Sequence, residues 1–372
     1  MSIFSNARLI LPEAVLHGGL AIEHGRITGI GEVTGGVDCE GDFLLPGLID
    51  LHTDNLERQV LPRNNARWPS RSALAAHDSQ CVAAGITTVF DALCLGDVGF
   101  EAARNDTFLA GLEDLRALSR LGALKAEHVL HLRCELPAAE MPRMLEEVIG
   151  DPLVRLLSIM DHTPGLGQYA DAGRYRALRA AEGYSATEID AVFTAQLESH
   201  HKYAAANRAL VLALAAAQGL PVASHDDRTS AEITRNAADG IGIAEFPVSM
   251  EAARAARHAN MQIIAGAPNI VRGGSHSGNV AVLDLVREGL VDALASDYVP
   301  ASMLEAAFIA AAEAALPLHA AIALITSGPA EIAGLTDRGQ LTPGLRADFI
   351  QVRVYGGLPV VRGVWRAGQR IG

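Results

Sequence analysis

The sequence predicts an α/β fold: a (β/α)8 TIM-like barrel with a small β-sandwich domain built from both termini. In the middle of the chain, short apolar runs alternate eight times with helical patterns, as in a barrel of parallel strands. No early run is followed by the Gly-x-Gly-x-x-Gly sequence of a doubly wound dinucleotide-binding sheet. Both ends of the chain contain short strand-like runs separated by Gly-rich turns. We therefore expect residues 1–43 plus 336–372 to form the small domain and residues 44–335 to form the barrel.

The predicted barrel strands are rich in Leu, Ile, Val and Ala, as buried parallel strands are. They cover Leu44–Leu51, Thr87–Leu93, Val129–Glu135, Val154–Asp161, Pro221–His225, Ile241–Phe246, Met261–Ala267 and Ala293–Asp297. Predicted helices cover Ser72–Ala84, Ala102–Leu121, Pro142–Ile149, Ser185–Gln218, Ser230–Asp239, Met250–Ala259 and Gly278–Glu288. The link from Thr163 to Gly219 is unusually long and helical, so we expect it to build a lid or an interface.

Composition narrows the range of partners. Of the 372 residues, 49% are hydrophobic, and the formal net charge of −13 argues against binding to nucleic acid or to an anionic membrane. The sequence shows neither a signal peptide nor an apolar stretch long enough to span a membrane. Its four cysteines are widely spaced, as reduced thiols usually are. We expect a cytoplasmic protein, a homo-oligomer, with a small phosphorylated molecule as its partner.

A candidate metal site begins at the end of the first predicted barrel strand. His52 and Asp54 lie two residues apart, so a strand would point both side chains to the same face. An imidazole and a carboxylate together suit a divalent metal, although an isolated His-x-Asp is more often an ion pair in a turn. Other metal-competent residues follow later strands: Glu135, Asp161, His162, His225, Asp226, Asp227, Glu245 and Asp297.

The carboxyl ends of barrel strands are where barrel active sites lie, so these side chains should converge on one mouth. Unpaired charges are costly to bury, and one or two divalent cations would explain so many at strand ends. Mixed imidazole and carboxylate ligands indicate Zn first, with Mn, Fe or Ni as alternatives.

A Gly-rich segment predicts anion binding. Arg272–Gly278 precedes a predicted helix, and its glycines would let backbone amides approach a phosphate closely. Arg272, Ser275, His276 and Ser277 would add polar contacts, and an ordinary turn is the alternative. Arg63 and Arg133 could hold further phosphates through two parallel hydrogen bonds each.

His77-Asp78 lies in the first helical pattern of the predicted barrel. A buried hydrogen-bonded pair and a substrate contact are equally good interpretations of it.

Long strings of residues are similar to the amidohydrolase superfamily across the whole chain, and most similar to its triphosphate diphosphatases of phosphonate utilisation. The strings that carry this resemblance are Pro46–Leu56, His77-Asp78, Ala84–Asp91, His131–Glu135, Asp161–Gly165, Gly266–Asn269, Arg272–Asn279, Ala295–Tyr298 and Gly344–Asp348.

The resemblance implies metal-dependent hydrolysis of a ribosyl 5-triphosphate to the 5-phosphate and pyrophosphate. It implies Asp297 as general base, and the metal set His52, Asp54, Glu135, His162, His225 and Asp297. The chain departs from the common pattern of the superfamily in having His-x-Asp for His-x-His, no bridging Lys, and Glu245 where His is common. Glu135 is then the natural bridge between two metals, and either His162 or Glu245 completes the metal set.

Two other functions remain open on the sequence. Hydrolysis of a C–N bond, in a cyclic amide or a deaminase substrate, is common on this scaffold, but a mouth rich in Arg, His and Ser suits it poorly. The barrel could also be a non-catalytic scaffold in a phosphonate-degrading assembly, which would need no stoichiometric metal.

Overall fold

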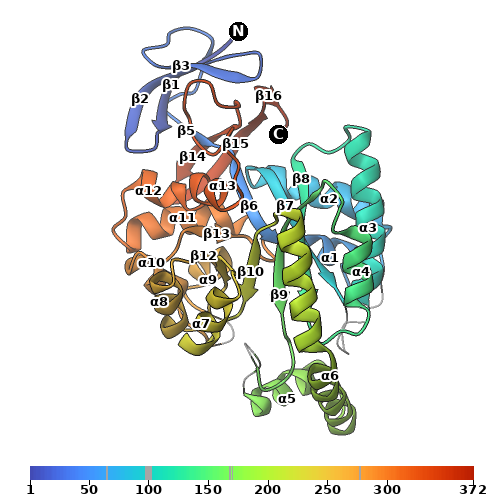
Figure 1. Ribbon diagram of the computed structural model, residues 1–372. Helices are drawn as coiled ribbons and strands as arrows, with labels where there is room; N and C mark the ends of the chain where they lie inside the picture. Colours follow the sequence, from blue (N-terminus) through green and yellow to red (C-terminus); the bar gives the residue numbers. More distant parts are fainter. Residues whose placement is uncertain (64–65, 97–102, 167–168, 170, 276–277) are drawn as a thin grey trace.

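The computed structural model describes residues 1–372 except 64–65, 97–102, 167–168, 170 and 276–277, which are grey in Figure 1. The chain forms a barrel of parallel strands, a sheet of terminal strands at one end of it, and two helices that extend from the other end (Figure 1). The predicted combination of a (β/α)8 barrel with a separate sheet from both termini is confirmed.

The barrel consists of eight parallel strands in sequence order. They are β6 (Leu48–Thr53), β7 (Ile86–Leu95), β8 (Glu127–Glu135), β9 (Val154–Met160), β10 (Val222–His225), β11 (Ile243–Glu245), β12 (Gln262–Gly266) and β13 (Ala293–Ala295). The ring is completed between β13 and β6 by a parallel bridge from Thr53 to Asp297. There the amide of Asp297 donates to the carbonyl of His52 (2.9 Å), and the amide of Asp54 donates to the carbonyl of Asp297 (3.0 Å).

The first predicted barrel strand, Leu44–Leu51, is in fact two strands in two different sheets. β5 (Phe43–Pro46) pairs with the terminal strands, and β6 begins at Leu48 in the barrel. Gly47 joins them where a Cβ atom would lie 2.4 Å from Oγ1 of Thr87. Pro46-Gly47 is a recognisable strand-breaking dipeptide, but both halves are wholly buried and apolar, so the predicted strand ran across the break. The predicted division into residues 1–43 plus 336–372 and 44–335 stays a prediction.

The terminal strands form one continuous sheet in which β5 joins the two ends of the chain. The strands are β1 (Ser2–Ile10), β2 (Val15–Glu23), β3 (Arg26–Gly31), β4 (Val37–Asp38), β14 (Phe349–Tyr355), β15 (Leu358–Arg366) and β16 (Gln369–Arg370). The expected sandwich is therefore a single hydrogen-bonded sheet. Rings from both ends meet in its core, where Phe4 lies edge-on to Phe349 (5.0 Å) and to Trp365 (5.1 Å).

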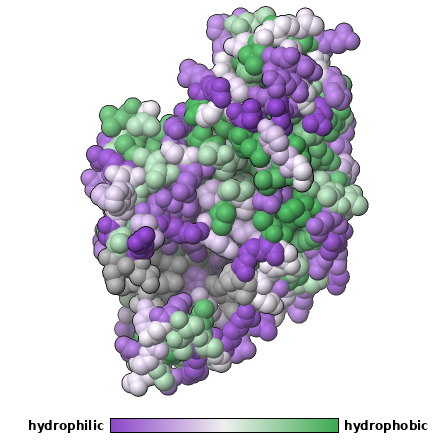
Figure 2. All heavy atoms as spheres, turned by 180° about the vertical axis from the view of Figure 1, so that it is seen from behind, coloured by the Kyte–Doolittle hydropathy of each residue, from purple (hydrophilic) through white to green (hydrophobic). Residues whose placement is uncertain are grey.

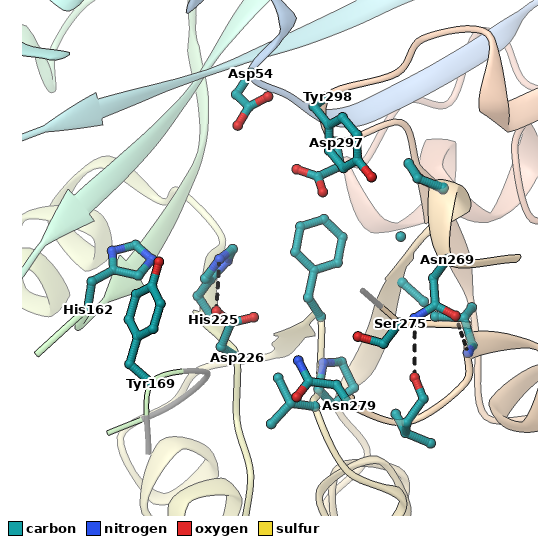
Figure 3. Close-up of a pocket in the computed structure, with 18 of the residues that line it drawn as sticks. Asp54, His162, Tyr169, His225, Asp226, Asn269, Ser275, Asn279, Asp297 and Tyr298 are labelled. Atoms are coloured by element: carbon teal, nitrogen blue, oxygen red, sulfur yellow. Dashed lines mark hydrogen bonds and ion pairs between the residues drawn. The ribbon is translucent and has the colours of Figure 1, made fainter. Parts of the chain in front are cut away.

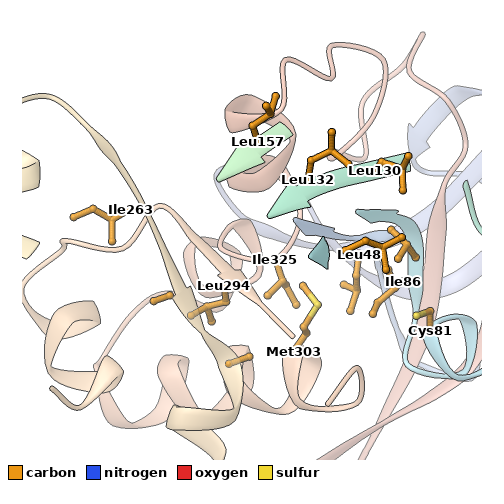
Figure 4. Close-up of a cluster of buried hydrophobic side chains, with 14 of the residues drawn as sticks. Leu48, Cys81, Ile86, Leu130, Leu132, Leu157, Ile263, Leu294, Met303 and Ile325 are labelled. Atoms are coloured by element: carbon orange, nitrogen blue, oxygen red, sulfur yellow. The ribbon is translucent and has the colours of Figure 1, made fainter. Parts of the chain in front are cut away.

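Helices surround the barrel and connect its strands (Figure 1). They are α1 (Asn55–Val60), α2 (Ser70–Ala83), α3 (Ala103–Arg120), α4 (Met141–Val148), α7 (Ser230–Ala238), α8 (Met250–His258), α9 (Ala267–Val271), α10 (Val282–Arg287), α11 (Ser302–Glu313), α12 (Leu318–Ala323) and α13 (Ser327–Ile332). Their inward faces and the outward faces of the strands form the main core, which contains Leu48, Leu130, Leu294 and Met303 (Figure 4).

The long link after β9 folds into α5 (Ala172–Ala181) and α6 (Ala186–Gln218), here called the α5–α6 insertion. Ser185 caps α6 by accepting from the amide of Glu188, whose carboxylate accepts from the amide of Ser185. Gly219 ends the helix with a φ of 64°. Every helix in the described part of the chain is too short or too polar to span a lipid bilayer.

Candidate active site

The carboxyl ends of the barrel strands surround a cavity of about 470 Å³. The rear face of the molecule is hollowed in its lower half, where polar side chains gather (Figure 2). Asp226 and Phe246 directly follow β10 and β11, and Asp297 lies two residues after β13; all three have a left-handed backbone, with φ of 59°, 55° and 54°. Such φ values in non-glycine residues cost roughly 1–3 kcal/mol each and are typical of functional sites.

Glu245 lies between two histidines and binds both. Its Oε1 is 2.8 Å from Nδ1 of His52, and its Oε2 is 2.7 Å from Nδ1 of His225. All three side chains are at least nine-tenths buried. Each imidazole therefore carries a proton on Nδ1, since a carboxylate can only accept, and Nε2 is the nitrogen through which either ring would bind a metal.

At this site, Nε2 of His52 and Oδ1 of Asp54 are buried and have no hydrogen-bond partner among the described residues. Leaving a polar atom buried and unsatisfied costs about 1–3 kcal/mol. An imidazole lone pair and a carboxylate oxygen are both metal ligands, and His52, His225 and Glu245 have ligand atoms within 4.8 Å of one another. His162, His225 and Asp226 form a second such group, so the residues present fit one or two divalent cations.

The electrostatics of the site also favour a cation. Burial, reinforced by the charge of Asp54, raises the pKa of Asp297 to about 7. Burial opposes the charged form of His225, but Asp226 and Glu245 outweigh it and raise the pKa of this histidine. Two buried carboxylates that repel one another are stabilised by a divalent cation between them.

Glu135 is the last residue of β8, His162 lies two residues after β9, and the two bind each other. Nδ1 of His162 is 2.5 Å from Oε2 of Glu135, and the amide of His162 donates to Oε1 at 2.9 Å. Figure 3 places His162 on one side of the cavity, with Asp54 and Asp297 above and His225 between. The structure therefore brings the six predicted metal-site residues to one region: His52, Asp54, Glu135, His162, His225 and Asp297.

The predicted substrate-binding residues divide into three groups. Arg133, Arg272 and Ser275 line the cavity, and Nη1 of Arg133 is 3.7 Å from Oδ2 of Asp54. Arg63 is exposed and is not among the described residues that line the cavity. His276 and Ser277 lie outside the described residues.

The Gly-rich segment does not lead directly into a helix. The predicted helix Gly278–Glu288 therefore has the wrong first residue. α10 begins at Val282, and Arg272 ends α9. Asn269 explains the difference, because its side chain accepts from the amide of Val282 (2.9 Å) and donates to the carbonyl of Val280 (3.2 Å). The segment thus brings side chains and amides to the cavity, but no long helix dipole.

Sequence reasoning missed three cavity-lining residues from the α5–α6 insertion: Tyr169, Arg179 and Gln196. They belong to the stretch expected to build a lid or an interface. Their separation along helices gives no pattern that distinguishes them from ordinary surface residues.

His77-Asp78 belongs to a separate buried network outside the cavity. His77 binds Asp91 (2.7 Å), and His128 binds both Asp91 (2.9 Å) and Asp78 (3.2 Å). Nδ1 of His77 accepts from Nδ2 of Asn55 at 3.0 Å. The contacts favour a buried structural role for His77-Asp78 over a substrate contact, but the two residues bind Asp91 and His128 rather than each other.

The chain is 40% identical to α-D-ribose 1-methylphosphonate 5-triphosphate diphosphatase of Escherichia coli strain K12, over 99% of this chain and 100% of that protein. Residues 191–369 also match the family model described as "Amidohydrolase family". The chain belongs to the amidohydrolase family.

Solved amidohydrolase-fold structures support the architecture. N-acetylglucosamine-6-phosphate deacetylase from Pasteurella multocida superimposes with a TM-score of 0.65 at 12% identity, covering 99% of both chains. 5-methylcytosine deaminase from Klebsiella pneumoniae gives a TM-score of 0.64 at 15% identity, covering 99% of this chain and 97% of that one. At these identities the likeness of this amidohydrolase to both structures concerns the fold.

Proposed function

We propose that this amidohydrolase hydrolyses α-D-ribose 1-methylphosphonate 5-triphosphate to the 5-phosphate and pyrophosphate in phosphonate catabolism. The observation that carries the proposal is the full-length 40% identity to the Escherichia coli diphosphatase, together with a cavity that joins a metal-competent cluster to arginines. Arg133 is 5% exposed and Arg179 is 8% exposed, so both present desolvated guanidinium groups to a ligand. A neutral cyclic amide or deaminase substrate would need no such groups, and we rank C–N hydrolysis second.

His52, Asp54, Glu135, His162, His225 and Asp297 would hold one or two divalent cations, with Zn as the first expectation. A cation bound there supplies Lewis-acid catalysis and lowers the pKa of water. Glu245 would act as the shared acceptor that orients His52 and His225, because each of its oxygens lies within hydrogen-bond distance of the Nδ1 atom of a different imidazole. We therefore propose His162, rather than Glu245, as the residue that completes the metal set.

Asp297 would be the general base. Water adds to phosphorus at the anhydride between the α and β phosphates, the bond to the bridging oxygen breaks, and the carboxylate of Asp297 takes the proton of the water. Arg272, the hydroxyl of Ser275 and nearby amides would stabilise the charge that develops on the leaving pyrophosphate. Arg133, beside Asp54, would bind a non-bridging phosphate oxygen.

We also propose a cellular location and an oligomeric state for the enzyme. We place it in the cytoplasm as a homo-oligomer without a nucleic-acid partner, in line with its formal charge of −13.

Phosphorus NMR tests the proposed function. Metal-reconstituted protein is incubated with ribose 1-methylphosphonate 5-triphosphate, and the products are followed over time. We expect equal amounts of pyrophosphate and a 5-phosphate, and no orthophosphate. Release of orthophosphate, or no turnover by protein that retains stoichiometric metal, would contradict the proposal.

Elemental analysis of the same preparations tests the metal set. Alanine at His52, Asp54, Glu135, His162 or His225 should lower bound metal, and full retention in Glu135→Ala would remove this residue as the bridge.

Arg272→Ala provides a further test of phosphate binding. Loss of a charge-assisted contact should raise KM for the triphosphate by about one to two orders of magnitude while metal content stays constant. Inorganic pyrophosphate should inhibit the parent competitively and the variant much less. Unchanged KM and unchanged inhibition together would make the loop an ordinary turn.

A further inference from the structure

The α5–α6 insertion gives the cavity a second cationic wall. Arg179 of α5 lines the cavity and is 8% exposed, and Gln196 of α6 lines it at 6% exposure. Figure 3 shows Tyr169 from the same insertion beside His162, while Ser275 and Asn269 lie across the cavity. The carboxylates of Asp54 and Asp297 therefore lie between a wall made by the insertion and a wall made by the Gly-rich loop.

Aromatic contacts hold this second wall in place. Tyr175 is 1% exposed, and its hydroxyl donates to Oε1 of Gln196 at 3.0 Å. The guanidinium of Arg179 lies 5.4 Å from the ring centre of Tyr175 and 5.8 Å from that of Tyr169. These cation–π contacts fix the charge before any ligand arrives, which lowers the entropy cost of binding.

The insertion is also tied to the rest of the site. Nδ1 of His200 on α6 is 2.6 Å from Oδ2 of Asp161, next to His162. At the other wall, Nη1 of Arg174 on α5 lies 3.0 Å from where a Cβ atom of Gly278 would be. The two walls thus approach each other closely at Gly278.

The two walls differ in their chemistry. The loop offers Arg272, the hydroxyl of Ser275 and unhindered amides, which suit a polyphosphate. The insertion offers one arginine, one amide and tyrosine rings, which suit a sugar that carries one small anion. Glu182 pairs with Nη1 of Arg179 at 2.9 Å, but its own side chain is 41% exposed, so water weakens its hold on the arginine.

We propose that Arg179, with Tyr169 and Gln196, forms an anion subsite for the methylphosphonate group on the anomeric carbon of the substrate. This inference rests on the proposed function, because the released pyrophosphate would leave from the loop side and the ribosyl phosphonate would remain on the insertion side. The subsite makes the enzyme select substrates with an anion at both ends of the ribose.

A pair of substrates that differ only at the anomeric carbon tests the subsite. Arg179→Ala should raise KM for ribose 1-methylphosphonate 5-triphosphate by roughly tenfold to a hundredfold, and by clearly less for ribose 5-triphosphate, with similar kcat. Arg272→Ala should raise KM for both substrates alike. Arg176→Ala is the matched control, because Arg176 is an arginine of the same helix that pairs with Asp190 at the surface.

If Arg179→Ala raised KM equally for both substrates, or for neither, the proposed subsite would be wrong. If Arg179→Ala does not fold, Arg179→Lys can replace it, because lysine keeps the positive charge but lacks the planar guanidinium. Its KM should still rise more for the phosphonate substrate than for ribose 5-triphosphate. Calorimetric binding of ribose 1-methylphosphonate to the metal-loaded parent and variants needs no turnover. Binding that is weakened by Arg179→Ala in a protein without diphosphatase activity would reject the proposed function but keep the subsite, and equal binding would reject the subsite.

Discussion

Among the described residues, histidines and carboxylates cluster both at the cavity and in a separate buried network, and the two places differ in how completely their polar atoms are satisfied. The cavity cluster contains His52, His225 and Glu245, and the buried network contains His77, Asp91 and His128. Both bring ligand atoms within 4.8 Å of one another, the spacing that a metal ion requires. Proximity and residue type therefore do not separate a metal site from a structural network.

Hydrogen bonding separates them. In the buried network both nitrogens of His77 and both nitrogens of His128 have a partner: Asn55, Asp78 or Asp91. In the cavity cluster Nε2 of His52 has none among the described residues, and Oδ1 of nearby Asp54 has none either. An imidazole whose Nδ1 is held by a carboxylate and whose Nε2 is left over is oriented for a metal. The contacts of the buried network are those of a structural element. The cavity cluster has unsatisfied ligand atoms that could bind a metal ion.

The largest expected effect comes from the cavity side. Asp297→Asn should lower kcat by roughly 10²–10⁴, because an amide cannot accept the proton that a carboxylate accepts. The protein should stay folded, as judged by an unchanged thermal unfolding temperature. A loss of activity below about tenfold would rule out Asp297 as general base.

The buried network should respond in stability instead. Asp91→Asn removes the carboxylate that faces His128, and breaking a buried ion pair on one side typically costs about 3–5 kcal/mol in the free energy of unfolding. Urea unfolding measures this cost, and elemental analysis should find unchanged metal content. Asp114→Asn is the control, since Asp114 pairs with a largely exposed Arg71 and should cost no more than about 1 kcal/mol. Loss of metal from Asp91→Asn would mean that the buried network, like the cavity cluster, contributes to metal binding.

Glu245→Gln probes the link between the two histidines of the cavity cluster. Gln keeps one acceptor oxygen and gains an NH2 donor, so one imidazole loses its acceptor and its fixed orientation. We expect metal affinity to fall about 10- to 100-fold, measured by competition with a chelator. Exposed Glu251→Gln should leave affinity at the parent value. If Glu245→Gln binds metal as tightly as the parent, Glu245 does not orient these ligands.

The smallest effect is a pH dependence of stability that arises from the buried network. Burial opposes the charged form of His128, but Asp91 and Asp78 outweigh it and raise its pKa to about 9. The folded state thus binds this proton more tightly than the unfolded state, where the pKa is about 6.5. The stabilisation is complete below about pH 6.5 and is lost as the pH rises through about 9.

Urea unfolding between pH 7 and 9 should therefore show a decline on the order of 1–2 kcal/mol in the free energy of unfolding. His128→Gln should be less stable at pH 7 and should show a flatter profile over this range. Parallel profiles for parent and variant would mean that His128 is neutral in the folded protein.

Much of the architecture was readable because the residue pattern and the fold agree. Six of the eight apolar runs end in or just before metal-competent residues, and the parallel barrel brings those ends together, which is how His52 and Asp297 became candidates although they lie far apart in sequence. Pro46-Gly47 signals the break in the sequence, but the predicted strand ran across it because both β5 and β6 are buried and apolar. Where one hydrophobic run supplies strands to two sheets, the strands that pair with each half show which residues belong to which sheet.

The cavity was less readable than the strand ends. Glu245 was recognisable as a polar strand end, but its two bonds to histidines depend on the curvature of the barrel. Arg179 and Gln196 come from helices that leave the barrel and return to it, so their positions depend on tertiary packing of the insertion. Arg63 shows the converse, since a plausible arginine near the first strand lies at the surface.

The sheet that joins β1–β4 to β14–β16 has a consequence for how the chain is made. Arg26 donates to the carbonyl of Gly344, which lies 318 residues further along, and Phe4 packs on Phe349 and Trp365. A ribosome adds on the order of 5–20 residues per second, so the first strands emerge many seconds before their partners. During that interval Leu9, Leu20 and Leu44 have no complete core to cover them. Until β14–β16 have been made, the N-terminal strands therefore expose apolar side chains that the folded sheet buries, which favours aggregation.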